Sequence, residues 1–175
     1  MPTPLVTAIA WATFAGGVCA AALWDIRFRR VPNRVSLAIA ATGLILGLAQ
    51  GAVAASVLGL AVGLGLLLVP FARGWLGAGD VKLLAAVGAW LGPQRTLYCA
   101  LAAAVFGGLL ALAFLVRLGP DYRRAVATNL RLAFYTREVP TVEDRPAGHC
   151  PPYAVAIGAG ALTVAVLFGG PGVTG

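Results

Sequence analysis

Long apolar runs separated by short polar segments dominate the pattern along this chain of 175 residues. An α-helix needs roughly 20 apolar residues to cross the hydrocarbon core of a bilayer, which is about 30 Å thick. The pattern predicts six membrane-spanning helices, placed at about 5–24, 35–49, 52–72, 75–92, 96–117 and 151–169. Because few polar positions remain, we expect residues 1–175 to form a single membrane-embedded domain, an all-α polytopic bundle.

The fourth predicted span is the shortest apolar run, since its uninterrupted part reaches only from Leu83 to Leu91. It crosses a membrane only if the helix begins near Trp75 or Asp80. The distribution of Lys and Arg favours such a crossing, because cytoplasmic loops carry an excess of these residues. With six spans, every Lys and Arg except Arg95 lies on the cytoplasmic side, and both termini lie outside. Without the crossing, six arginines of the segment 117–145 would move outside.

The segment 118–150 is the long loop of this topology and is expected to be cytoplasmic. Within it, apolar side chains recur every four residues at Tyr122, Val126, Leu130 and Phe134. Such spacing on one face predicts an amphipathic helix that lies on the inner leaflet of the membrane.

The composition supports a membrane protein, because 60% of the residues are hydrophobic and 11% are charged, against roughly 25% charged in soluble domains. The net charge of +7 comes from basic residues beside the apolar runs, where they indicate topology and contact with anionic lipids rather than nucleic acid. Cys19, Cys99 and Cys150 are widely spaced and form no CxxC pair. His149 is the single histidine, so neither a metal site nor a cofactor is expected.

Two carboxylates border the predicted membrane helices. The other four acids, Asp121, Glu138, Glu143 and Asp144, belong to the long loop. Asp25 ends the first span and Asp80 opens the fourth, so the topology puts both at the cytoplasmic level of the bilayer. Ionisable groups at membrane depth are costly and usually functional. Two aspartates that share a site can activate a water and protonate a carbonyl, which is the chemistry of peptide hydrolysis.

Structural roles account for the same residues and remain open on spacing alone. Asp25 could pair with Arg27 or Arg29, and Asp80 could cap the fourth helix, where a carboxylate is favourable. Lys82 could neutralise either acid. A proton-coupled transporter is a further alternative, although its ionisable site usually lies near the bilayer midplane. A non-catalytic assembly protein is another.

Three segments resemble the type IV prepilin peptidases, the bacterial branch of the GxGD intramembrane aspartyl proteases. The stretch GAGDVK, residues 77–82, matches the signature Gly-x-Gly-Asp-x-Lys. Residues 24–33, WDIRFRRVPN, resemble the first catalytic segment, in which an aspartate precedes basic residues and Pro-Asn. Residues 151–160, PPYAVAIGAG, resemble the motif of the last helix. The segments keep the order of the family, and the resemblance covers nearly the whole chain.

The resemblance implies that Asp25 and Asp80 are catalytic. The residues that it implies as support for the site or for a substrate groove are Gly77, Gly79, Lys82, Pro32 and Asn33. It also implies cleavage of the basic leader from a prepilin at the cytoplasmic face of the inner membrane, just before the apolar helix of the substrate. The expected partners are therefore a prepilin, the pilus-assembly apparatus and membrane lipids.

One departure from the longer members concerns the first inside loop. In those members it carries an added domain, often with paired CxxC motifs, and they also N-methylate the new pilin terminus. Here the loop is only about residues 25–34 and has no cysteine. The chain thus resembles the short, peptidase-only members such as those of Flp/Tad pilus systems, and methyltransferase activity is not expected. A GxGD protease that cleaves some other membrane peptide is the closest alternative.

Overall fold

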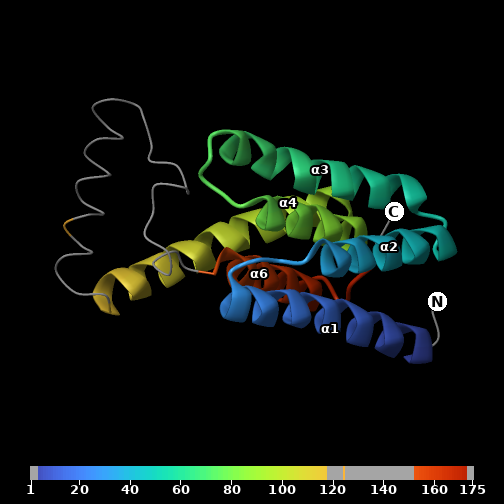
Figure 1. Ribbon diagram of the computed structural model, residues 1–175. Helices are drawn as coiled ribbons and strands as arrows, with labels where there is room; N and C mark the ends of the chain where they lie inside the picture. Colours follow the sequence, from blue (N-terminus) through green and yellow to red (C-terminus); the bar gives the residue numbers. More distant parts are fainter. Residues whose placement is uncertain (1–3, 118–123, 125–151, 173–175) are drawn as a thin grey trace.

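The computed structural model describes residues 4–117, 124 and 152–172, and nearly all of them are helical (Figure 1). The helices are α1 (Pro4–Phe28), α2 (Asn33–Ala49), α3 (Val53–Ala72), α4 (Ala78–Arg117) and α6 (Tyr153–Leu167). No strand occurs within these ranges, so the predicted all-α class is confirmed for them. The predicted amphipathic helix falls in the segment 118–150, which lies outside the described residues apart from residue 124.

Among the described residues, three helices are long and apolar enough to cross a membrane: Leu5–Phe28, Val53–Ala72 and Ala78–Arg117. The helices α2 and α6 are also apolar but have only 17 and 15 residues. Large hydrophobic side chains cover the outside of the bundle, as at Leu37, which is 70% exposed. Together these features indicate a membrane protein. The prediction of six separate spans is not confirmed, because the described residues form five helices.

The discrepancy arises in α4, whose 40 residues would measure about 60 Å as one straight rod. Gly92 interrupts it with φ 76° and ψ 174°, a conformation that glycine adopts without a steric penalty. Pro93 follows, and proline disfavours helical geometry in the residue before it. The break falls between the predicted spans 75–92 and 96–117, although the first arm begins only at Ala78.

The two arms of α4 run in opposite directions. Asp80, in the first turn of the first arm, interacts electrostatically with Tyr153 at the start of α6. Gly107, in the second arm, packs against the same Tyr153 ring. The chain therefore leaves this end of the bundle, reverses at Gly92 and comes back. Near the reversal, Arg95 donates to the carbonyl oxygens of Gly170 and Gly172 at 3.3 and 3.0 Å, beyond the other end of α6.

The first arm of α4 is the centre of the bundle, because every residue from Leu83 to Gly92 is buried. Small residues bring α3 against it: a Cβ at Gly63 would lie 2.5 Å from the carbonyl oxygen of Leu84. In lipid, such close approach is a main source of helix association. On the α2 side, the indole N–H of Trp90 donates to the Ile39 carbonyl at 2.7 Å.

The helices α1 and α6 lie antiparallel beside this centre. A Cβ at Gly158 of α6 would lie 3.1 Å from the Val18 side chain of α1, and Gly170 lies near Trp11. The end of α1 therefore meets the start of α6. The starts of α2 and α4 lie at this same end, so four helix termini surround one small region.

Candidate functional site

Asp25 lies in the last turn of α1, which continues to Phe28, beyond the predicted end at residue 24. Its side chain is only 8% exposed, whereas its neighbours Trp24 and Ile26 are 47% and 53% exposed. The carboxylate therefore faces the bundle interior. The helix ends just after it, where Arg29 adopts a left-handed φ of 53° and its N–H donates to the Asp25 carbonyl at 2.8 Å.

The Asp25 carboxylate has a backbone partner in α6. The N–H of Ala154 donates to Oδ2 of Asp25 at 3.2 Å. Ala154 is the second residue of α6, and the first four N–H groups of a helix have no partner within that helix. Asp25 thus provides an acceptor for the Ala154 N–H, which would otherwise be buried without a hydrogen-bond partner. The Arg29 guanidinium also interacts electrostatically with Asp25, so one of the structural roles considered for this acid is present.

Asp80 lies in the first turn of α4 and is half-buried. Its N–H donates to the Gly77 carbonyl at 3.2 Å, and the Gly77 backbone hydrogen-bonds to its carboxylate. Gly77 and Asp80 thus form a compact unit at the helix start. A negative charge is favourable there because of the helix dipole.

The carboxylates of Asp25 and Asp80 interact electrostatically with each other. The fold therefore brings together the two acids that the sequence analysis singled out, from the end of α1 and the start of α4. Like charges that interact disfavour the ionisation of both groups at once. Such a pair can hold one shared proton and present one ionised oxygen, which suits general acid and general base chemistry on a bound water.

The other predicted site residues lie in two segments that pack against each other. Lys82 donates from Nζ to Oδ1 of Asn33 at 3.0 Å. A Cβ at Gly79 would lie 3.3 Å from the Cβ of Val31, so the absence of a side chain lets the segments touch. Pro32 precedes α2 with φ −63° and ψ 137° and accepts from the N–H of Val35 at 3.0 Å.

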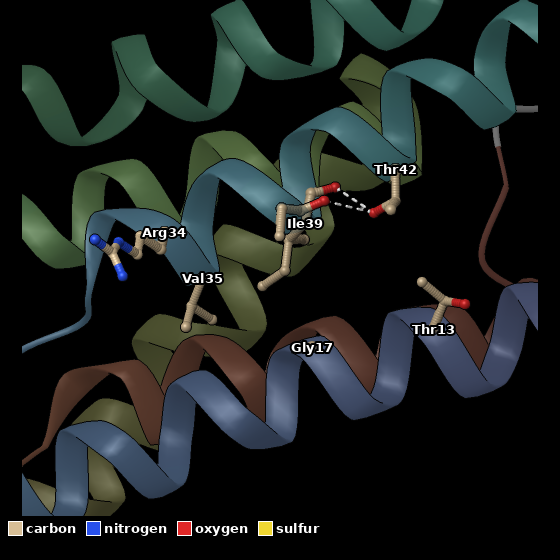
Figure 2. A pocket seen from close by; sticks show the side chains of 7 residues that line it. Thr13, Gly17, Arg34, Val35, Ile39 and Thr42 are labelled. Carbon is tan, nitrogen blue, oxygen red and sulfur yellow. Dashed lines mark hydrogen bonds between the residues drawn. The ribbon is translucent and has the colours of Figure 1, made fainter.

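An open groove of about 310 Å³ lies between α1 and α2 (Figure 2). Arg34 lies at one end, next to Asn33, while Thr13 and Thr42 lie at the other. The Thr42 hydroxyl donates to the carbonyls of Ala38 and Ile39 at 2.8 and 3.0 Å, so it offers no free donor to the groove. Neither aspartate lines this groove, and the sequence analysis did not predict it.

Sequence analysis did not identify two residues that interact with the acids, Tyr153 and Ala154. The Tyr153 hydroxyl interacts electrostatically with Asp80, and Ala154 binds Asp25 through its backbone. The last-helix motif at 151–160 pointed to this segment but not to these contacts. Among the described residues, no cluster of three or more His, Cys, Asp or Glu could hold a metal ion.

Comparison with known proteins adds one finding. The sequence profile of the type IV leader peptidase family matches residues 12–112, more than half of the chain, and this range contains both aspartates and both motif segments around them. No curated protein and no solved structure matches the chain. Given the extent of the profile match, the chain belongs to the type IV leader peptidase family.

Proposed function

We propose that this protein is an aspartic endopeptidase that removes the basic leader from an Flp-like type IV prepilin at the cytoplasmic face of the inner membrane. The observation that carries the proposal is the placement of Asp25, at the end of α1, and Asp80, at the start of α4, at one end of the bundle, where their carboxylates interact electrostatically. Membership of the leader peptidase family supports a peptidase activity in general. The pair of aspartates offers a mechanism by which that activity could cleave a peptide bond.

In the proposed reaction, the ionised carboxylate takes a proton from a water, and the oxygen of that water attacks the scissile carbonyl carbon. The protonated carboxyl donates its proton to the carbonyl oxygen. When the tetrahedral intermediate collapses, the C–N bond breaks and the carboxyl that gained a proton gives it to the leaving amine. The other carboxylate takes a proton back from a hydroxyl of the intermediate, so both acids return to their starting states. The Ala154 amide orients Asp25, and the Gly77 backbone orients Asp80.

Gly77 and Gly79 support the proposed site because neither carries a side chain that would keep an extended substrate away from Asp80. Gly77 is exposed, and the nearest atom that a Cβ there would meet is Oδ2 of Asp80, at 3.5 Å. A peptide backbone that approaches the carboxylate over Gly77 therefore meets little steric resistance.

The positions of the basic residues support a cytoplasmic site. Arg29, Arg34 and Lys82 lie at the end of the bundle that holds the aspartates, whereas Arg95 binds carbonyls at the opposite end. Because positive charge accumulates on the cytoplasmic side, this distribution favours the aspartate end as the inner one. We further propose that α2, α6 and both arms of α4 cross the membrane, which puts both termini outside.

The short connection between α1 and α2 supports a peptidase without a second activity. Only residues 29–32 link Phe28 to Asn33, and the chain has no CxxC motif there. The proposed enzyme therefore cleaves without methylating the new terminus.

Co-expression with a candidate prepilin tests the proposal. Asp25→Ala and Asp80→Ala should each abolish leader cleavage at wild-type membrane abundance, while the loop-acid control Asp144→Asn should cleave normally. Normal processing in either aspartate variant would exclude the role. Cleavage of an unrelated membrane peptide, but not of a prepilin, would instead identify a GxGD protease with another substrate.

A further inference from the structure

The first turn of α6 contacts Asp25 directly and interacts electrostatically with Asp80. The Ala154 amide binds Oδ2 of Asp25, and Ala154 itself is fully buried. The residue before it, Tyr153, interacts with Asp80 through its hydroxyl. The next amide along, that of Val155, donates elsewhere, to the Pro152 carbonyl at 3.2 Å. The contact with Asp25 is thus specific to one backbone donor.

Packing against the second arm of α4 fixes the position of this turn. A Cβ at Gly107 would lie 2.6 Å from Cε2 and 3.2 Å from Cδ2 of Tyr153, so the ring rests on the space that glycine leaves. Further along, a Cβ at Gly160 would lie 2.9 Å from both the Ala103 nitrogen and the Cys99 carbonyl oxygen. These two contacts hold the part of α6 that carries the Ala154 amide against the second arm of α4.

We propose that the first turn of α6 is a positioning element for the reaction, in which the Ala154 amide sets the orientation of the Asp25 carboxylate and the Tyr153 ring, seated on Gly107, keeps that amide in place. This inference rests on the proposed function, since it assumes that the aspartates react. Tyr153 and Ala154 act through Asp25 and Asp80, and are positioning residues rather than catalytic ones.

Two adjacent glycines offer a matched test. Gly107→Ala introduces a methyl group under the Tyr153 ring, whereas Gly108→Ala introduces one where no atom lies within 4 Å. With purified protein and a prepilin, we expect Gly107→Ala to lower kcat about tenfold or more with KM within about twofold, the range expected for a weakened hydrogen bond to a carboxylate. Gly108→Ala should match wild type. Equal kcat values for the two variants would overturn the proposal.

A double-mutant cycle shows whether the effect passes through the ring. Tyr153→Phe keeps the ring but loses the hydroxyl, and it should retain more activity than Tyr153→Ala, which should lose about as much kcat as Gly107→Ala. In the Tyr153→Ala background, adding Gly107→Ala should cause no further loss, because residues that act as one unit are not additive. Additive losses would mean that Gly107 acts by another route and would contradict the inference.

Ala154→Pro tests the amide itself. This test remains valid even if the glycine variants do not fold. Proline removes the N–H but is tolerated in the first turn of a helix. Val155→Pro is the control, because it adds the same ring to the same turn and removes an amide that donates to the Pro152 carbonyl and not to Asp25. We expect a loss of about tenfold to 100-fold in kcat and an altered pH profile only for Ala154→Pro, at wild-type membrane abundance and melting temperature. The same profile in both variants would overturn the proposal.

The Asp25→Ala variant, run beside these proteins, separates the two hypotheses. If Asp25→Ala still cleaves, the proposed function fails, and the positioning role fails with it. If Asp25→Ala is inactive while Ala154→Pro and Gly107→Ala behave like their controls, the aspartic mechanism stands and the positioning role alone is rejected.

Discussion

Lys82 donates a hydrogen bond from Nζ to Oδ1 of Asn33, and the two atoms lie 3.0 Å apart. The amine therefore joins the start of α4 to the start of α2, and each aspartate is anchored instead by backbone: Asp25 by Ala154 and Asp80 by Gly77. The family signature thus links two segments that are distant in sequence. We therefore infer that Lys82 holds these two segments together and takes no direct part in the chemistry of the carboxylates.

A double-mutant cycle on this pair follows from the contact. Lys82→Met and Asn33→Ala should each slow prepilin cleavage by roughly twofold to tenfold, which corresponds to one exposed hydrogen bond of about 0.5–1.5 kcal/mol. The double variant should be no slower than either single one. Cleavage rates of the four proteins provide the measurement. Strict additivity, or a complete loss with Lys82→Met alone, would instead assign the lysine a role at the aspartates.

The contact between Gly79 and Val31 predicts that replacing Gly79 by alanine lowers the stability of the protein more than replacing Gly77 does. A methyl group at Gly79 would lie 3.3 Å from the Val31 Cβ and 3.4 Å from its backbone nitrogen, two atoms that cannot rotate away. Gly79→Ala should therefore destabilise the protein by about 1 kcal/mol, at the lower end of overpacking costs. Gly77→Ala should unfold like wild type, since its nearest neighbour is 3.5 Å away. Thermal unfolding in detergent distinguishes the two, and equal melting temperatures would contradict this packing.

Part of the architecture follows from the sequence, because three of the described helices come from apolar runs long enough to cross a bilayer. The same runs put Asp25 and Asp80 at one level, and the fold brings these acids together. Helix boundaries were less predictable: α1 continues past residue 24 to Phe28 and α4 begins at Ala78, because caps and turns rather than hydrophobicity determine where a helix ends.

The contacts of α6 with the acids could not be read from the sequence for a physical reason. The donor to Asp25 is a backbone N–H, which every residue except proline carries, so no residue type marks it. Likewise, Gly107 and Gly108 are identical neighbours in sequence, and only the packing of Tyr153 distinguishes them.

The reversal at Gly92 predicts a specific sensitivity in α4. An alanine at φ 76° and ψ 174° would be strained by roughly 1–3 kcal/mol, because this region of backbone conformation is essentially restricted to glycine. Gly92→Ala should lower the melting temperature in detergent. Gly65→Ala is the matched control, since a Cβ there meets nothing within 4 Å and alanine favours a helix. A Gly92→Ala variant as stable as Gly65→Ala would show that α4 does not need this turn.

The proposed orientation predicts which end of the bundle a membrane-impermeant thiol reagent can reach from outside the cell. Arg30, between α1 and α2, and Gln94, just after the reversal of α4, are both exposed and lie at opposite ends. In a background in which Cys19, Cys99 and Cys150 are replaced by alanine, Gln94→Cys should react in intact cells. Arg30→Cys should react only after the membrane is opened, because the proposed orientation puts the Lys- and Arg-rich end in the cytoplasm. The reverse labelling would put Asp25 and Asp80 on the outer side, where the leader of a prepilin that has not yet crossed the membrane could not reach them.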